Sequence, residues 1–233
     1  MASDSGGKLC VIPARGGSKR LPRKNVLDFR GRPMLAHTIQ AARDSGCFAR
    51  ILVSSDDEAT LEIAERHGAA CHARDAALAG DEARVVAVIL DVLESEAAAG
   101  RDYELLCCLY PAAPLRLASD VAAVVGLIEP GRCDFAMAVT DYGLPPHQAL
   151  RLDDDIALTP MFPDLIERRD DEVGRLVVDN GSTYAASVPA FQAQQSFYGT
   201  GLRGHVMPRS RSVDINSAED LALADFYFER LSA

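Results

Sequence analysis

The sequence predicts an α/β protein whose mostly parallel sheet is covered by helices on both faces. Short apolar segments at residues 8–13, 50–54, 104–110 and 134–139 are expected to be strands, with amphipathic helices between them. Strands that alternate with helices of this length are typical of parallel sheets. Such sheets bind ligands beyond the carboxyl ends of their strands, so a site is expected in the loops at that edge.

The helices are assigned from periodicity and end signals. Pro33 suits the first turn of the first helix, and Gly46 ends it. Between them, Leu35, Ile39 and Ala42 form an apolar stripe. Further helices are expected at residues 58–67, at 84–99, after Ser119 as N-cap, and from about Ser217, whose pairing with Asp220 resembles a capping box. Regular structure is also expected at residues 183–187 and 205–207.

Composition narrows the class of protein. The chain has 233 residues and a formal net charge of −10, which argues against nucleic acid as a partner. It contains no apolar run near the roughly 20 residues that span a bilayer, and its first residues lack a secretory signal, so a cytoplasmic location without membrane attachment is expected. The six cysteines show no CxxC spacing, and we interpret them as small hydrophobic residues in a reducing compartment.

The regular pattern is interrupted between residues 140 and 178. This stretch contains four prolines and two acidic clusters, at residues 153–155 and 170–172, and it lacks clear periodicity. We therefore expect residues 1–233 to form a single domain in which 140–178 is an excursion from the sheet, such as a small subdomain or a dimer arm.

A cationic glycine loop follows the first expected strand. Residues 12–25 read IPARGGSKRLPRKN, and their basic members are Arg15, Lys19, Arg20, Arg23 and Lys24. Such a concentration of cations in an acidic protein indicates a dedicated anion site, and Gly16 and Gly17 allow backbone N–H groups to line it. The spacing is neither that of a Walker A loop nor G-x-G-x-x-G. The alternative is a glycine turn with solvated basic side chains.

This segment resembles the signature of the acylneuraminate cytidylyltransferases, which make CMP-activated nonulosonic acids. The resemblance covers nearly the whole chain. Other segments resemble the family's motifs in order: Ser54-Ser55-Asp56-Asp57, Arg74 with Leu78 and Asp81, residues 110–116, Asn180-Gly181-Ser182 with Tyr184, and Asp214-Ile215-Asn216. Tyr110 and residues 145–150 look closest to the pseudaminic acid branch, whereas Asn180-Gly181-Ser182 looks more like the sialic and legionaminic branches.

The resemblance implies a Rossmann-like nucleotidyltransferase fold with a dimerisation excursion, and a homodimer. It implies that CTP and a nonulosonic acid react to CMP-sugar and pyrophosphate with Mg²⁺ as cofactor. The implied catalytic residues are Arg15, Lys24 and Asp214, and the implied nucleotide-binding residues are Ala14, Arg15, Gly16, Gly17, Ser18, Lys24, Asn25, Arg74 and Tyr110. The implied sugar-binding residues are Gln148, Arg169, Asn180, Gly181 and Ser182, and the implied metal ligands are Asp214 and Asn216.

The chain departs from the family pattern at two positions. Val85 stands where the family has a hydroxyl, which removes one hydrogen bond to the base. Asn216 stands in place of the second acidic residue of the metal motif; its amide oxygen can coordinate Mg²⁺ but brings no charge. The alternative for Asn216 is a role in the turn before the last helix.

Several roles stay open at this point. Arg168 and Arg175 compete with Arg169 as the cation for the sugar carboxylate, and Arg74 has the alternative of a surface arginine. His147 and His205 show no partner, so no general base is assigned. The rival functions are a nucleotidyltransferase with another acceptor, such as 3-deoxy-manno-octulosonate, or another nucleotide, and a catalytically weak nucleotide-binding scaffold.

Overall fold

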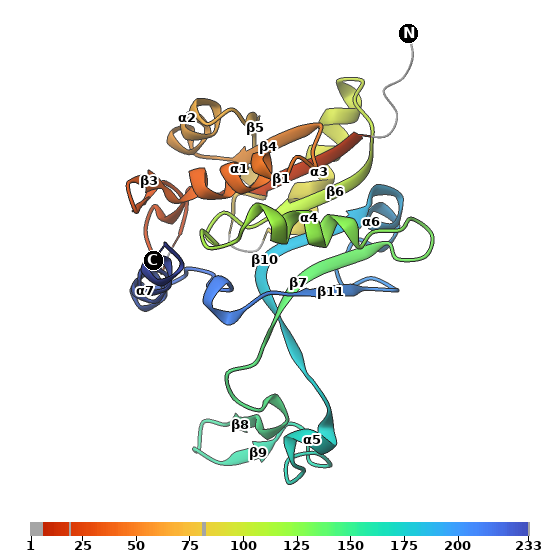
Figure 1. The fold of residues 1–233 in the computed structure, drawn as a ribbon. Coiled ribbons are helices and arrows are strands. Elements are labelled where there is room, and N and C mark those ends of the chain that lie inside the picture. The colour runs from red at the N-terminus through yellow and green to blue at the C-terminus, as the bar shows by residue number, and fades with distance from the viewer. Residues whose placement is uncertain (1–6, 19, 81–82, 233) are drawn as a thin grey trace.

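The centre of the protein is a sheet between two layers of helices (Figure 1). The structure is a computed structural model that describes residues 7–18, 20–80 and 83–232, and within these residues the main sheet has seven strands. In chain order they are β1 (Gly7–Pro13), β4 (Arg50–Ser55), β5 (Ala70–Ala73), β6 (Tyr103–Leu109), β7 (Phe135–Asp141), β10 (Val177–Ser187) and β11 (Arg203–Val206).

The strands lie in the order β11-β7-β10-β6-β1-β4-β5. Every neighbouring pair is parallel except the two pairs that include β10, which runs antiparallel to both β6 and β7. In the centre, Val11 of β1 is in register with Leu52 of β4 and Cys108 of β6. The predicted α/β class with a mostly parallel sheet is therefore confirmed.

Helices cover both faces of the sheet, as expected (Figure 1). The helices of the described residues are α1 (Met34–Asp44), α2 (Glu58–Arg66), α3 (Val85–Ala98), α4 (Ala118–Gly126), α5 (Asp170–Val173), α6 (Val188–Gln194) and α7 (Ala218–Ser232), of which α5 lies on an arm away from the sheet. Short 3₁₀ turns occur at η1 (Lys24–Val26), η2 (Ala76–Leu78), η3 (Pro146–Gln148) and η4 (Arg209–Arg211). Helices α1, α2 and α4 pack on one face, and α3 and α6 pack on the other.

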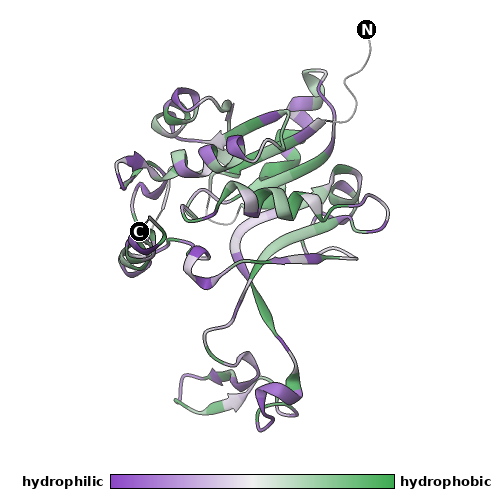
Figure 2. Ribbon diagram, viewed as in Figure 1, coloured by the Kyte–Doolittle hydropathy of each residue, from purple (hydrophilic) through white to green (hydrophobic). Residues whose placement is uncertain are grey.

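Strand β1 shows why the central strands are apolar on both sides. Cys10 and Ile12 join the core beneath α1, α2 and α4, whereas Leu9 and Val11 join the core beneath α3 and α6. A parallel strand buried on both faces has no polar side to present, so its sequence is a continuous apolar run. Figure 2 shows the consequence, with hydrophobic colour concentrated in the central strands.

A third small core joins the start and the end of the chain. The two-stranded hairpin of β2 (Asp28–Phe29) and β3 (Arg32–Pro33) packs with α7 through Phe29, Ile215 and Ala224. The backbone N–H of Ile215 donates to the carbonyl oxygen of Ala112 over 2.9 Å. This packing brings the C-terminal segment 213–216 beside the carboxyl ends of β1 and β6.

An arm extends from the sheet between β7 and β10 (Figure 1). It carries the hairpin of β8 (Leu150–Leu152) and β9 (Leu158–Pro160), together with η3 and α5. The arm lies within the stretch for which the sequence predicts an excursion. The two strands that lead into the arm belong to the main sheet, and the single domain stays a prediction.

One sequence-based assignment needs correction, and two elements that pack in or on the main sheet were not predicted. Ser119 is not an N-cap, because α4 begins at Ala118 and the carboxylate of Asp120 accepts the backbone N–H of Leu117 over 2.9 Å. Strand β5 and helix α6 were not expected. Strand β5 reads ACHA and shows no apolar alternation, and α6 is a short helix that follows β10 directly.

The cysteines and helices agree with a protein that uses neither disulfides nor membrane helices in its described part. Cys10, Cys107 and Cys108 are fully buried free thiols, and burial raises the pKa of each well above its usual value. Among the described residues, no helix combines the length and the apolar character that crossing a bilayer requires. The cytoplasmic location itself stays a prediction.

Gly199 is the position where the fold most clearly requires a missing side chain. A Cβ there would lie 2.1–2.4 Å from three ring carbons of Phe135, which is fully buried in β7. We expect Gly199→Ala to lower the free energy of unfolding by about 1–3 kcal/mol, as overpacking does. Chemical denaturation measures this, with Gly126→Ala as control. Gly126 ends α4, and apart from its chain neighbours and the backbone of α4 itself, no described atom lies within 4 Å of its added Cβ. Equal stability of both variants would contradict the prediction.

Candidate active site

A cavity of about 240 Å³ opens at the carboxyl ends of β1 and β6, next to β4 and β5. Apolar residues Pro13, Val85 and Val88 form part of its wall. Its polar lining consists of Arg15, Lys24, Asn25, Arg74, Tyr110, Asp214 and Asn216. The structure thus brings together residues from four motif segments that the sequence analysis singled out, together with Val85. Their lining of one cavity fits the expectation of one site at this edge.

The glycine loop is held against the start of α2. The backbone N–H of Gly16 donates to Oδ1 of Asp56 over 2.9 Å. A Cβ on Gly16 would lie 2.6 Å from Cβ of Asp57, so only glycine permits this close approach. The amide of Gly16 is therefore already engaged within the protein, contrary to its expected availability to a phosphate. Ala14 is buried at the base of the loop, and its N–H donates to the carbonyl of Ser54.

The amides of Gly17 and Ser18 belong to the part of this loop nearer solvent. Gly17 is exposed, and apart from its two chain neighbours no described residue has an atom within 4 Å of a Cβ built on it. Two residues named above, Lys19 and Asp81, lie outside the described residues. The proposed phosphate contacts of this loop stay a prediction.

Asn25 carries a buried acceptor at the cavity wall. Its Nδ2 donates to the carbonyl oxygen of Arg15 over 2.8 Å, which ties the two ends of the loop together. Its Oδ1 is buried and has no hydrogen-bond partner among the described residues. A buried acceptor without a partner is unfavourable, so a ligand that donates a hydrogen bond there would be stabilised.

Lys24, Asn216 and Asp214 form a connected polar group. The ammonium of Lys24 donates to the carbonyl of Ile215 over 2.7 Å and to Oδ1 of Asn216 over 3.0 Å. Nδ2 of Asn216 donates to Oδ2 of Asp214 over 2.7 Å. Asn216 thus bridges a cation and an anion, using its amide oxygen for one and its amide nitrogen for the other.

Burial shifts the charges of this group toward neutrality. It lowers the pKa of Lys24, with Asp214 opposing the shift and Arg20 and Arg15 adding to it. Burial also raises the pKa of Asp214, against the stabilising hydrogen bond from Asn216 and the charge of Lys24. A cation-rich cavity that already disfavours its own positive charges gains most from an anionic ligand.

Arg74 is a buried residue and not a surface arginine. Only 9% of it is exposed, and its guanidinium donates to the carbonyl of Ser54 over 2.7 Å and to Oγ of Ser54 over 3.2 Å. Burial lowers its pKa, an effect that Asp56 opposes and Arg15 reinforces. The side chain is therefore fixed on one side by β4 while it lines the cavity.

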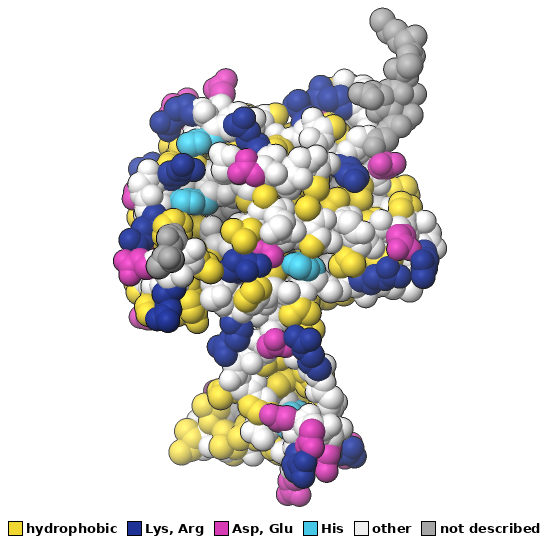
Figure 3. Space-filling view, in the orientation of Figure 1, with side chains coloured by type: hydrophobic (Ala, Val, Ile, Leu, Met, Phe, Trp, Pro, Cys, Tyr) yellow, Lys and Arg dark blue, Asp and Glu magenta, His cyan; other side chains and the backbone are white. Residues whose placement is uncertain are grey.

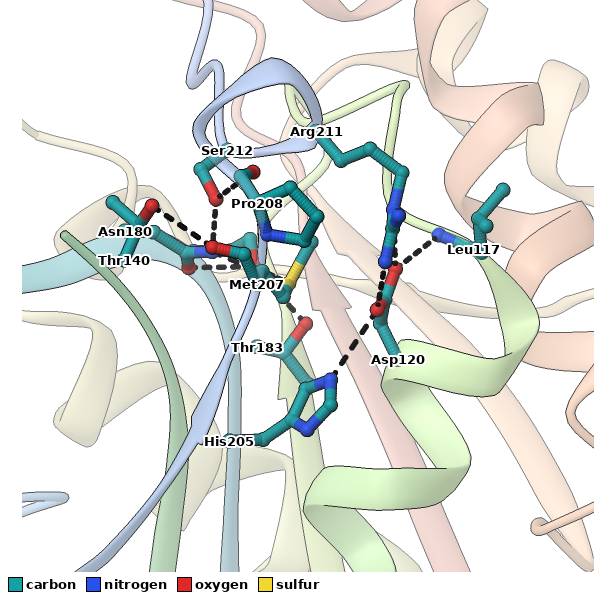
Figure 4. A network of polar contacts seen from close by, with 11 residues as sticks. Leu117, Asp120, Thr140, Asn180, Thr183, His205, Met207, Pro208, Arg211 and Ser212 are labelled. Carbon is teal, nitrogen blue, oxygen red and sulfur yellow. Dashed lines mark hydrogen bonds and ion pairs between the residues drawn. The ribbon is translucent and has the colours of Figure 1, made fainter. Parts of the chain in front are cut away.

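The segment Asn180-Gly181-Ser182 lies next to Asp214, and Figure 4 shows its first residue, Asn180, beside Ser212 and Met207. The side chain of Asn180 is buried, donating to Oγ of Ser212 over 3.1 Å and accepting from Oγ of Ser182 over 2.7 Å. Gly181 has φ +67°, and its missing Cβ would lie 3.4 Å from Oδ2 of Asp214. Asn180 and Ser182 therefore bond within the protein, and Gly181 is the member that lies beside Asp214.

A buried carboxylate that the sequence analysis missed anchors the C-terminal segment (Figure 4). Asp120 on α4 accepts two hydrogen bonds from Arg211, at 2.7 and 3.2 Å, and lies 3.3 Å from Nε2 of His205. His205 therefore has a partner after all. So does His147, whose Nε2 lies 3.1 Å from the carbonyl oxygen of Arg168.

A second cavity of about 570 Å³ adjoins the first and shares Val85 and Tyr110 with it. Its wall is aromatic: the ring centroids of Tyr110 and Tyr184 lie 5.3 Å apart, and those of Tyr184 and Phe197 lie 5.2 Å apart. The hydroxyls of Tyr184 and Tyr198 both donate to Asp179. Residues 196–198 were not predicted, because they lie in a loop with no motif.

Gln148 and Arg169 lie on the arm and not at either of these cavities. Both side chains are exposed, and Arg169 pairs with Asp171 on the same arm. The competing Arg175 pairs with Asp141 over 3.0 Å. Within this chain, the structure does not bring these residues to the cavity of Arg15 and Asp214, and their roles stay predictions.

Comparison with known proteins identifies the family. A profile described as cytidylyltransferase matches residues 9–129, which is more than half of the chain. Over 95% of this chain and 96% of the relative, 32% of residues are identical to a pseudaminic acid cytidylyltransferase of Campylobacter jejuni. The chain belongs to the cytidylyltransferase family. It is thus a nucleotidyltransferase by family, as the resemblance implied.

Other matches agree with this assignment. A CMP-N,N'-diacetyllegionaminic acid synthase of Legionella pneumophila is 30% identical, over 95% of this chain and 96% of the relative. A solved CMP:2-keto-3-deoxy-manno-octonic acid synthetase in complex with CTP matches with a TM-score of 0.72 over 97% of this chain and all of the other. At 17% identity, that structure supports the Rossmann-like cytidylyltransferase fold alone.

The described residues of this cytidylyltransferase fit Mg²⁺ only in part. They contain no group of three or more His, Cys, Asp or Glu that would hold a metal ion without other ligands. Asp214 is the one carboxylate among the described residues of the cavity wall, while the amide oxygen of Asn216 already accepts from Lys24. Mg²⁺ is commonly held by one or two carboxylates together with substrate phosphates, a mode that Asp214 suits.

Replacing Asp120 tests the anchor of the C-terminal segment. Burial raises the pKa of Asp120, but hydrogen bonds from Arg211, Leu117 and His205 outweigh it and lower the pKa overall. We expect Asp120→Ala to lower the free energy of unfolding by about 2–3 kcal/mol at neutral pH, since it leaves a guanidinium without its partner. Because the folded-state pKa is depressed, this difference is present above about pH 4 and disappears as the pH falls through the folded value.

Urea denaturation at several pH values measures this difference. Asp141→Ala is the matched control, because it removes the partner of another arginine, Arg175, at an exposed position. Exposed pairs contribute little, so the control should keep nearly the stability of the wild type. A loss that is the same in both variants, or that does not change with pH, would contradict the anchoring role.

Proposed function

We propose that this cytidylyltransferase transfers CMP from CTP to a nonulosonic acid of the pseudaminic acid type and releases pyrophosphate. The observation that carries the proposal is the single cavity lined by Arg15, Lys24 and Asp214, with an aromatic cavity beside it at Tyr110. The two cavities provide adjacent places for a nucleotide and for a larger acceptor. The pseudaminic acid relatives support the choice among nonulosonic acids.

The first cavity suits a cytidine nucleotide. We infer that Arg15 and Lys24 neutralise the triphosphate, since both cations line the same wall. The unpaired Oδ1 of Asn25 accepts a hydrogen bond from a ribose hydroxyl, which satisfies it. Arg74 donates to the O2 and N3 acceptors of cytosine. With Val85 supplying no hydroxyl, this guanidinium carries the recognition of the base.

The residues of this cavity orient the substrates and neutralise the charge of the phosphates, and they do not themselves form covalent bonds to the substrates. In-line attack of the anomeric hydroxyl on the α-phosphorus expels pyrophosphate, and charge neutralisation with correct orientation supplies most of the rate enhancement. Asp214 is the proposed ligand of Mg²⁺, and Asn216 orients Asp214 and Lys24 without ligating the metal. When bound, Mg²⁺ supplies positive charge at the phosphates and lowers the pKa of an oxygen that it contacts.

The aromatic cavity suits the acceptor. Tyr110 lines both cavities, so an acceptor in the second one lies beside a nucleotide in the first. Gly181 leaves space beside Asp214 for the approach of the hydroxyl. In this proposal Asn180 and Ser182 fix the position of Gly181 and are not themselves sugar ligands.

Pyrophosphate release tests the function directly. The purified protein is incubated with CTP, Mg²⁺ and a panel of pseudaminic, legionaminic and sialic acids and 3-deoxy-manno-octulosonate, and we expect the highest kcat/KM with pseudaminic acid. Asp214→Asn should lower kcat by about 10²–10³-fold, the size typical of a lost charge-stabilising contact at a reaction centre.

Asp44→Asn, at an exposed aspartate that ends α1, is the matched control and should keep wild-type kinetics. Absence of pyrophosphate with every nonulosonic acid would count against the proposal. Preference for 3-deoxy-manno-octulosonate would support the rival acceptor. Tight CTP binding without turnover would support the scaffold alternative.

We also propose that two copies associate through the arm. Leu152, Ile156 and Leu158 are 64%, 81% and 58% exposed in the β8–β9 hairpin, and Figure 3 shows hydrophobic atoms gathered on that side of the arm. A contiguous apolar surface of this kind is typical of a protein interface. In a homodimer, Gln148 and Arg169 would serve the site of the partner, which explains their distance from the cavity of their own chain.

Charged substitutions in the hairpin test the dimer. We expect Ile156→Asp combined with Leu158→Asp to shift the protein from dimer to monomer in sedimentation equilibrium, because two unpaired carboxylates would be buried at the interface. Loss of activity together with the dimer is expected if Gln148 and Arg169 act across it. A wild-type monomer, or a variant dimer of unchanged stability, would contradict this assignment.

A further inference from the structure

A chain of four polar side chains leads from the cavity to helix α3. Arg74 Nε donates to Oγ of Ser54 over 3.2 Å, and Oγ of Ser54 lies 3.2 Å from Nδ1 of His72. Nε2 of His72 lies 3.5 Å from Oδ2 of Asp91 on α3. Ser54 and His72 are register partners on β4 and β5, so the sheet itself places them side by side.

With a neutral His72 ring, the hydrogen bonds that link these four side chains can run in only one direction. A guanidinium only donates, so Oγ of Ser54 is the acceptor for Arg74 and its own proton is free for Nδ1 of His72. The ring then carries its proton on Nε2, which faces the carboxylate of Asp91. Each group fixes the orientation of the group before it, ending at the guanidinium.

Because these side chains are buried, the orientation of the Arg74 guanidinium depends on their hydrogen bonds. Ser54 is fully buried, and the side chain of His72 is 11% exposed. Little water is present to replace a missing partner. Without His72, the hydroxyl of Ser54 would therefore have no fixed acceptor for its proton and would hold Arg74 less firmly. Arg74 also donates to the carbonyl of Ser54, and the two bonds to one residue define the plane of the guanidinium.

We propose that His72, supported by Asp91 and acting through Ser54, is a positioning residue that sets the selectivity of the site for cytosine over uracil. The inference rests on the proposed function, in which Arg74 contacts the base. Cytosine N3 accepts a hydrogen bond, whereas uracil N3 carries a hydrogen and repels a donor held in the same place. A fixed guanidinium therefore discriminates between the bases, and one that rotates discriminates less.

The alternative is a purely structural role, in which His72 only packs on the edge strand β5. Ala70, two residues before His72 and therefore on the same face of β5, packs against the apolar core beneath α3, so a histidine beside it could serve packing alone. A purely structural histidine would affect stability but treat CTP and UTP alike. The ratio of affinities for the two nucleotides is therefore the decisive measurement.

The experiment measures binding of CTP and UTP by calorimetry with Mg²⁺, and kcat and KM with the best acceptor. We expect His72→Phe to weaken CTP binding about 10-fold and to lower the CTP/UTP affinity ratio by a similar factor, the effect of losing about one buried hydrogen bond. We expect kcat at saturating CTP to stay within about 2-fold of the wild type, because the phosphates are held by other residues.

His72→Asn is the rescue variant, since its Oδ1 takes the place of Nδ1 as acceptor for Ser54. It should recover most of the CTP/UTP ratio. His67→Phe is the matched control, because His67 lies at the C-terminal end of α2 and takes no part in the linked side chains from Arg74 to Asp91. It should leave the CTP/UTP affinity ratio unchanged. If His72→Phe does not fold, Asp91→Asn tests the same linked side chains from their more exposed end. It should also lower the CTP/UTP affinity ratio, by about 2–5-fold.

The outcomes separate the two proposals. A wild-type protein that binds neither nucleotide overturns the proposed function. A wild-type protein that prefers CTP, with the same CTP/UTP ratio in folded His72→Phe or in Asp91→Asn, overturns the role of His72 alone. A stability loss that leaves the ratio unchanged also assigns His72 a structural role and overturns the inference.

Discussion

The site depends on one contact between two distant parts of the chain, the hydrogen bonds of Lys24 to Ile215 and Asn216. Lys24 follows the glycine loop after β1, whereas Ile215 and Asn216 precede the last helix. Each segment alone would be an exposed turn with solvated charges. Joined across the end of the sheet, they form two walls of a cavity, and the small core around Phe29 and Ile215 holds them there.

The electrostatics of the cavity follow from its burial. The protein has an excess of acidic residues, yet its cavity wall gathers Arg15, Lys24 and Arg74 with a single described carboxylate, Asp214. Burial already lowers the pKa of Lys24 and of Arg74. A phosphate-bearing ligand relieves this unfavourable burial of cations, which is why the free site is poised for a polyanion.

The sequence predicted those parts of the fold and site whose residues are neighbours along the chain. The apolar run of β1, its glycine loop and the Asp214 segment could be assigned because each carries a local pattern. The roles of Asp120, Asp179 and Tyr198 could not be assigned, because they arise from pairs such as Asp120 with Arg211 and Asp179 with Tyr198 that only folding brings near. The same holds for Gly16, whose need for a small residue comes from Asp57, 41 positions along the chain.

Asn216 shows how a departure from a family pattern is accommodated. An amide donates and accepts at once, so Asn216 satisfies Lys24 with its oxygen and Asp214 with its nitrogen. A carboxylate at this position would accept from Lys24 but would stand against Asp214 with a like charge, a repulsion that a bound cation would have to offset. The asparagine therefore joins Lys24 and Asp214 in the absence of a ligand, and it would leave the proposed Mg²⁺ one anionic ligand fewer than a second carboxylate. In the proposed site, the phosphates of CTP would supply the remaining negative charge for Mg²⁺, which would link metal binding to nucleotide binding.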